Sequence, residues 1–160
     1  MITPKEVRDK EHKGGIISYN QIEDLIYAGN NMCCQMHFDK ELLSKGISAD
    51  ISLEAERLDD PRGVTYFFWF PWKEDTAPPA ELINLALDTL ELLRNHKIKA
   101  YIHCKNGHGR TTTLLASYFI RKNKMTAEEA LKLVKDKRPS MHLNGEQKAF
   151  LKAFEKKDAV

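Results

Sequence analysis

The residues with the clearest chemical potential lie close together between positions 103 and 111. Cys104 carries a thiol that becomes a nucleophile once it is ionised, and Arg110 carries a planar guanidinium that can bind two phosphate oxygens at once. Gly107 and Gly109 lie between them, and they predict a backbone that takes up positive φ and approaches a ligand closely. The segment is therefore a candidate phosphate-binding loop with its own nucleophile.

The elements expected on either side of this loop favour the same interpretation. Residues 99–103 predict a short buried strand, and the mostly apolar residues 111–123 predict a helix. A loop that leaves a strand and enters a helix points several backbone N–H groups and the positive end of the helix dipole at one place. This field attracts an anion and favours the thiolate form of Cys104.

The order of residues 103–111 resembles the His-Cys-x-x-Gly-x-x-Arg-[Ser/Thr] signature of the protein tyrosine phosphatase superfamily, and the match is complete. Over residues 16–154 the chain looks most similar to small dual-specificity phosphatases. Lys-Gly-Ile at 45–47, an acid-bearing loop before a long helix, and an Arg-Pro pair near the C-terminus recur in the order typical of that group.

The resemblance implies hydrolysis of phosphate monoesters through a phosphocysteine intermediate. Cys104 would attack phosphorus, Arg110 would bind the phosphate, and Thr111 would hydrogen-bond the thiolate when it leaves. The resemblance places the phosphate-binding residues at His103, Lys105, Asn106, Gly107, His108, Gly109 and Arg110. His103 is also expected to orient Cys104 without transferring protons itself.

A general acid is expected on the loop at residues 71–79. In the resembled family, proline commonly follows the acid by four residues. This spacing fits Asp75 with Pro79 and also Glu74 with Pro78, and we favour Asp75. Protonation of the leaving oxygen and later activation of a water would both fall to this carboxyl group.

The sequence leaves several readings of the substrate open. Phosphotyrosine and phosphoserine or phosphothreonine in proteins are the main expectation. Lys105 and His108 resemble the loop of tensin-type lipid phosphatases, which keeps a phosphoinositide open as a substrate, and an RNA 5′-triphosphate is a further alternative. A non-catalytic phosphate-binding module is disfavoured because Cys104 and Arg110 are both present.

No metal or other cofactor is expected. A zinc site could be assembled from His103, Cys104 and His108 with Cys33 or Cys34, but the chain has no Cys-x-x-Cys pair to support it. A redox role for Cys33 or Cys34 is a weaker hypothesis.

The hydrophobic pattern predicts a single α/β domain of the phosphotyrosine protein phosphatase type. We expect a central, mostly parallel, twisted sheet of four to five strands flanked by helices, with a polar tail at 1–15 and the catalytic domain at 16–157. Residues 16–22 and 25–28 favour a hairpin. Strands are also expected at 49–53 and 64–70, the second buried on both faces, and helices at 37–45, 79–96, 126–138 and 144–154.

Composition and charge limit the class of protein and the compartment that we expect. Lys and Arg number 25 against 23 for Asp and Glu, and a net charge of +2 is too small to indicate a general nucleic-acid binder. No acidic residue occurs between Leu92 and Ala127, so this stretch is expected to attract anions. Three cysteines do not form a disulfide framework, and no apolar run is long enough for a membrane span. We expect a cytoplasmic monomer.

Overall fold

The fold is built on one sheet of five strands in the order β1-β2-β5-β3-β4. The structure is a computed structural model that describes residues 17–31 and 38–158. β1 pairs antiparallel with β2, and all the other pairings are parallel. The strands are β1 (Tyr19–Glu23), β2 (Ile26–Asn30), β3 (Ile47–Glu54), β4 (Tyr66–Trp72) and β5 (Lys99–Cys104). The predicted α/β class, the hairpin and the mostly parallel sheet are confirmed.

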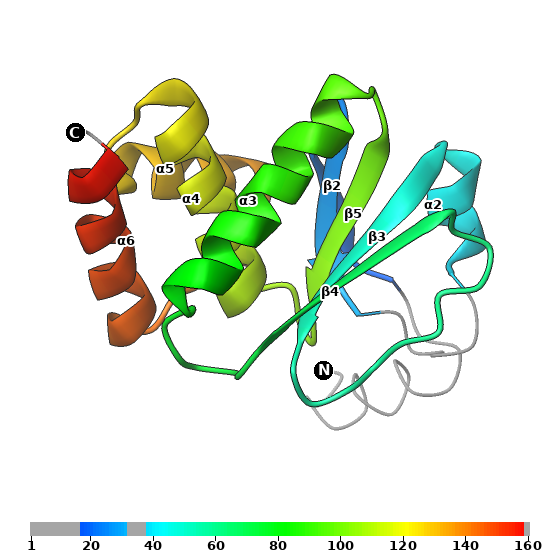
Figure 1. Ribbon diagram of the computed structural model, residues 1–160, viewed down its shortest axis with the longest axis horizontal. Coiled ribbons are helices and arrows are strands. Elements are labelled where there is room, and N and C mark those ends of the chain that lie inside the picture. The colour runs from blue at the N-terminus through cyan, green and yellow to red at the C-terminus, as the bar shows by residue number, and fades with distance from the viewer. Residues whose placement is uncertain (1–16, 32–37, 159–160) are drawn as a thin grey trace, which may run out of the picture.

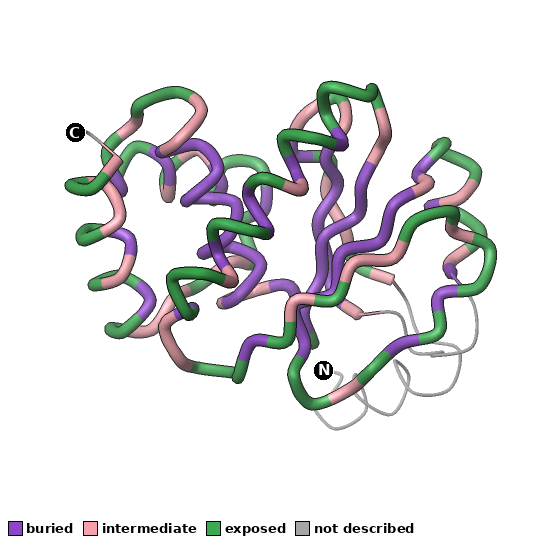
Figure 2. Tube along the Cα trace, viewed as in Figure 1, coloured by how far each residue is buried: buried purple, intermediate pink, exposed green. Residues whose placement is uncertain are grey.

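Four of the helices gather on one side of this sheet, as Figure 1 shows, and α2 lies on the other side. The helices of the described residues are α2 (Lys40–Ser44), α3 (Ala80–Asn95), α4 (Gly109–Asn123), α5 (Ala127–Lys137) and α6 (Gly145–Asp158). α4 is buried on nearly all of its faces and packs among α3, α5 and α6. In Figure 2 it forms, with the central strands, the buried part of the trace. None of the helices in the described ranges is long and apolar enough to cross a lipid bilayer.

Side chains on β5 alternate between the two faces of the sheet. Ile102 and Cys104 belong to the core under the helices, together with Ile51 and Leu114. Tyr101 belongs to the smaller core on the other face, with Phe38, Leu42 and Ile47. Cys104 therefore emerges on the helix-covered face, where β5 ends and α4 begins.

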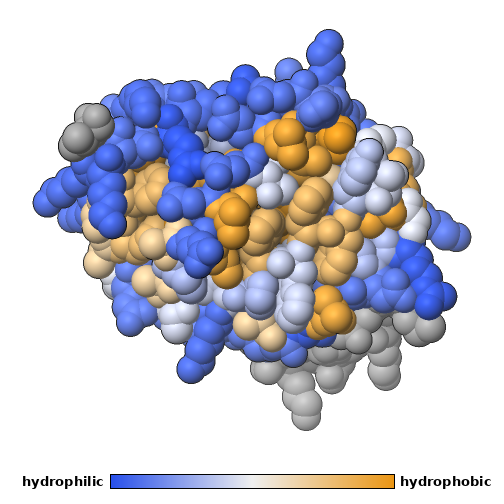
Figure 3. All heavy atoms as spheres, viewed as in Figure 1, coloured by the Kyte–Doolittle hydropathy of each residue, from blue (hydrophilic) through white to orange (hydrophobic). Residues whose placement is uncertain are grey.

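β4 differs from the sequence expectation. It was predicted to be buried on both faces, but it pairs only with β3 and forms an edge of the sheet. Its residues Tyr66 and Trp69 are 43% and 41% exposed. Figure 3 shows apolar side chains on this face of the molecule. An apolar run alone does not distinguish a central strand from an edge strand that is half covered by a helix.

Several strand and helix boundaries also differ from those expected. β2 continues through Gly29 and Asn30, which were expected to end it, and α4 begins at Gly109 instead of Thr111. The helix expected over 37–45 spans only Lys40–Ser44. The expected tail at 1–15, and Cys33 and Cys34, lie outside the described residues.

Candidate active site

The predicted phosphate loop lines a cavity of about 410 Å³ at the carboxyl end of β5. Cys104 ends this strand, and Arg110 and Thr111 lie in the first turn of α4. The nucleophile, the guanidinium and both candidate acids therefore share one space. The cavity is lined by Glu74, Asp75, Cys104, Asn106, His108, Gly109, Arg110, His142, Leu143, Asn144 and Gln147.

The two glycines of the loop are required for different reasons. Gly107 has φ of +69°, and a Cβ there would stand 2.3 Å from the carbonyl oxygen of Gly29. Gly109 was also expected at positive φ, but it does not have one. Instead, a Cβ at Gly109 would lie 3.0 Å from the amide of Gln147. One glycine is needed for conformation and the other for the close approach of a side chain.

Arg110 is held at one end and unpaired at the other. Its Nη1 donates to Glu56 Oε2 at 2.7 Å and to the carbonyl of Trp72 at 2.7 Å. Its Nη2 is buried and has no hydrogen-bond partner among the described residues. Burial lowers the pKa of Arg110, but the bond to Glu56 and the electrostatic influence of neighbouring groups raise it more, so the guanidinium stays charged. The free nitrogen is available to an anion.

Arg138 fixes the shape of the loop, a role that the sequence analysis missed. It is 1% exposed, and its guanidinium donates to the carbonyl oxygens of Gly107 at 3.0 Å and Asn106 at 3.3 Å. A third bond reaches Asn20 Oδ1 at 2.9 Å. These bonds hold two backbone carbonyl groups of the loop in place. The Arg-Pro pair that ends α5 was the only sequence signal for this contact.

The loop that carries the candidate acids is held by side chains from elsewhere in the chain. Glu56 accepts a bond from the backbone N–H of Glu74 at 3.1 Å while it also pairs with Arg110. At the start of α6, Glu146 accepts from the backbone N–H of Ala77 at 3.1 Å. Burial raises the pKa of Glu56, but the bonds from Arg110 and from backbone N–H groups lower it more. Glu56 thus connects the phosphate-binding guanidinium to the acid loop.

Both Glu74 and Asp75 line the cavity, so the geometry does not choose between them by position alone. Asp75 has φ of 60°, a left-handed conformation that is uncommon for a residue other than glycine. Its carbonyl accepts a bond from Asn144 Nδ2 at 2.8 Å. Uncommon backbone conformations that neighbouring groups maintain concentrate at functional positions.

Gln147 combines a helix cap with a place in the cavity. Its backbone N–H donates to Asn144 Oδ1 at 2.9 Å, and its Oε1 accepts from the Asn144 N–H at 3.3 Å. The two residues therefore form a reciprocal cap at the start of α6. Because Gln147 also lines the cavity beside Gly109, capping and ligand contact do not exclude each other.

His103 lies on the opposite face of β5 from Cys104. It is fully buried, and its Nε2 is 3.0 Å from Asp50 Oδ1. Burial lowers the pKa of His103, but Asp50, with Asp59 and Glu54 nearby, raises it more. His103 is not among the residues that line the cavity, and its imidazole lies against Asp50 instead.

Among the described residues, His103, Cys104 and His108 do not come together as a group of possible metal ligands, because His103 lies behind the strand. Behind the loop, His103 does lie near Glu54 and Asp59. Asp59 already pairs with Arg57 Nε at 3.0 Å. This buried group of charges is an ion cluster made from the protein's own side chains.

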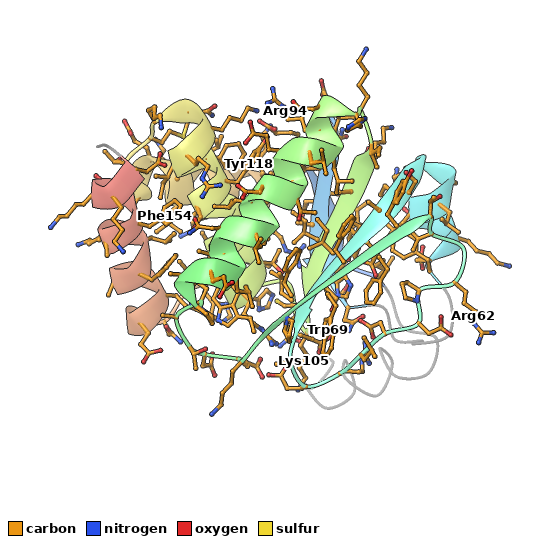
Figure 4. All side chains as sticks on the ribbon, in the orientation of Figure 1. Arg62, Trp69, Arg94, Lys105, Tyr118 and Phe154 are labelled. Atoms are coloured by element: carbon orange, nitrogen blue, oxygen red, sulfur yellow. The ribbon has the colours of Figure 1, made fainter. Side chains whose placement is uncertain are left out.

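Of the predicted site residues, the catalytic ones Cys104, Arg110 and Asp75 line the cavity, as do Asn106, His108 and Gly109. Lys105, Gly107 and Thr111 do not; the Thr111 hydroxyl is buried without a partner in the described part of the chain. The basic stretch does not converge on the site. Arg121 pairs with Asp88, and Figure 4 shows Arg94 at the opposite end of the molecule from Lys105.

The parallel sheet, the loop from β5 into α4 and the cavity around Cys104 and Arg110 define a protein of the cysteine-dependent phosphatase type. The chain belongs to the dual specificity phosphatase catalytic domain family, whose model matches residues 26–157.

Individual relatives agree with this assignment. The mouse dual specificity protein phosphatase CDC14B is 33% identical over 98 residues, 61% of this chain and 19% of that protein. The human phosphatidylglycerophosphatase and protein-tyrosine phosphatase 1 is 38% identical over 56 residues, 35% of this chain and 28% of that protein. The chain thus spans less than a third of the length of either. A crystal structure of Tk-PTP superimposes with a TM-score of 0.73 and 26% identity, covering 88% of this chain and 95% of that one.

Proposed function

We propose that this protein hydrolyses phosphate monoesters through a phosphocysteine intermediate. The observation that supports this most directly is the shared cavity, where Cys104 lies at the N-terminal end of α4 beside a guanidinium nitrogen of Arg110 that has no partner among the described residues. A phosphate placed there would meet backbone N–H groups, the helix dipole and a guanidinium at once.

The proposed reaction has two halves. The Cys104 thiolate attacks phosphorus, the bond to the leaving oxygen breaks, and the acid loop gives that oxygen a proton. A water then attacks the phosphocysteine and gives its proton to the same carboxylate, and the phosphorus–sulfur bond breaks to return the thiolate. Arg110 would bind the phosphate oxygens in both steps, and the two bonds of its Nη1 fix the position of the guanidinium.

We assign the proton transfers to Asp75. Its left-handed backbone and the bond from Asn144 to its carbonyl fix the residue at the cavity wall. Thr111 would donate a hydrogen bond from its hydroxyl to the departing thiolate. This role suits a buried hydroxyl that has no other partner among the described residues. His103 would act from behind the strand and orient Cys104.

Phosphotyrosine and phosphoserine or phosphothreonine in proteins are the proposed substrates, and the enzyme would work as a monomer in the reducing cytoplasm. The mouse relative CDC14B is named a dual specificity protein phosphatase, which supports protein substrates. A phosphate carried by a lipid is the second candidate, because one relative is named a phosphatidylglycerophosphatase.

The decisive test replaces the nucleophile. Cys104→Ser should abolish hydrolysis of para-nitrophenyl phosphate while the protein still binds tungstate, because the loop that holds the anion is unchanged. Phosphate release and anion titration would be measured on the same preparations. Turnover at the wild-type rate by Cys104→Ser would sink the proposal, and a wild-type protein that binds tungstate without turnover would be a binding module.

A further inference from the structure

Two histidines lie side by side in the wall of the cavity. His108 comes from the catalytic loop and His142 from the segment between α5 and α6. Their ring centroids are 4.8 Å apart, with planes inclined by 53°. Both line the same space as Cys104, so they lie next to any phosphate bound at the loop.

Neither imidazole has a structural partner that explains its position. His108 is the N-cap residue of α4 but makes no side-chain cap bond. Within residues 17–31 and 38–158, their contact with each other is the one interaction of their side chains in hydrogen-bond, ion-pair or ring terms. Two adjacent imidazoles without acceptors offer N–H donors to a ligand.

The charges around the pair favour an anion as that ligand. Burial lowers the pKa of His108, and the positive charges of His142 and Arg138 lower it further. A bound anion would offset the repulsion between these positive groups. The charged and titratable groups around the cavity are Arg138 at the end of α5, Cys104 and Arg110 in the catalytic loop, and Glu74 and Asp75 in the acid loop.

The rest of the wall suits a hydroxylated leaving group better than an aromatic one. Among the residues that line the cavity, Leu143 alone has a large apolar side chain, whereas amide groups come from Asn106, Asn144 and Gln147. An aromatic ring binds best between apolar walls, and a polyol needs donors and acceptors such as these.

We infer that His108 and His142 form a subsite for a second anionic group, so that, among the lipid-borne phosphates that are the second candidate substrates, the enzyme prefers polyol headgroups that carry another phosphate beside the scissile one. This inference rests on the proposed phosphatase activity. A doubly phosphorylated peptide fits less well, because successive side chains of an extended peptide point to opposite sides and do not enter one cavity together.

The test compares two substrates that differ only in the second phosphate: a myo-inositol monophosphate and a vicinal bisphosphate of the same inositol. Both would be offered in solution and as lipid headgroups in phosphatidylcholine vesicles, and kcat/KM would be taken from phosphate release. The wild-type ratio of bisphosphate to monophosphate should be well above one in at least one of the two forms, which also identifies the source. A ratio near one in both forms would overturn the inference.

The variants separate the subsite from general damage. His142→Ala should lower the ratio by roughly tenfold, the effect expected for losing a hydrogen bond to a charged group. His96→Ala, an exposed histidine at the end of α3, is the matched control and should leave the ratio unchanged. If the ratio of bisphosphate to monophosphate kcat/KM is the same in His142→Ala as in the wild type, the assignment of His142 to the subsite is wrong.

One further measurement tests the polyol assignment. A larger ratio for a doubly over a singly phosphorylated peptide than for the inositol pair would overturn the polyol assignment. If wild-type protein fails even on para-nitrophenyl phosphate, the proposed function is wrong; if only the ratio is near one, the subsite alone is wrong.

Discussion

The catalytic loop and the acid loop meet at one cavity but are held in place in different ways. The catalytic loop is continuous with β5 and α4, and its outer carbonyls are bound by the buried Arg138. The acid loop is fixed mainly through groups distant in sequence, among them Glu56 and Glu146. A short motif can specify the first kind of loop, whereas the second depends on how the whole domain assembles.

The largest effect is expected at Arg110, which belongs to the catalytic loop and is connected to the acid loop through Glu56. Arg110→Lys should lower kcat/KM for para-nitrophenyl phosphate by about 10³-fold, because lysine cannot bind Glu56 and a phosphate through one planar group. Steady-state kinetics would measure this. A loss of less than tenfold would show that a simple positive charge is enough at this position.

Next in size is the choice between the two acids. Asp75→Asn should lower kcat by about 10²-fold and remove the fall in rate at high pH, since the amide cannot lose a proton. Glu74→Gln is the matched control, because Glu74 is its neighbour and lines the same cavity. Full pH–rate profiles of both variants would be compared, and the reverse pattern would reassign the acid to Glu74.

A third prediction concerns the ion cluster behind the catalytic loop. Because the pKa of His103 is raised in the folded protein, its pairing with Asp50 stabilises the fold below the unfolded value near 6.5, and this contribution is lost as pH rises through the folded pKa. Asp50→Asn should therefore cost roughly 2 kcal/mol at pH 6 and less at pH 9.

Urea unfolding of the wild type and of Asp50→Asn from pH 6 to pH 9 would show whether the destabilisation shrinks as pH rises. Asp88→Asn, which removes an exposed partner of Arg121, is the control and should change stability little at any pH. A destabilisation by Asp50→Asn that grows with pH would show that His103 is neutral in the fold.

The sequence alone predicts the catalytic loop well, but it does not predict the distant contacts that support the two loops. The positions of Cys104 and Arg110 follow from one motif between a strand and a helix, because all the determinants lie within about ten residues. Arg138 reaches the loop from 31 residues away and Glu56 from more than 50, and neither carries a local pattern that names its partner. Similarly, the edge position of β4 depends on the strand order, which hydrophobic periodicity does not encode.

The smallest predicted effect tests the distant support of the acid loop directly. Glu146→Ala removes the acceptor of the Ala77 N–H and should lower kcat by about two- to tenfold, the effect of losing a single hydrogen bond. Tungstate affinity should be unchanged, since the catalytic loop does not depend on this contact. Glu128→Ala, an acid in the first turn of α5, is the matched control for loss of an N-terminal charge. Equal effects of the two variants, or weaker tungstate binding by Glu146→Ala, would show that the two loops are not supported independently.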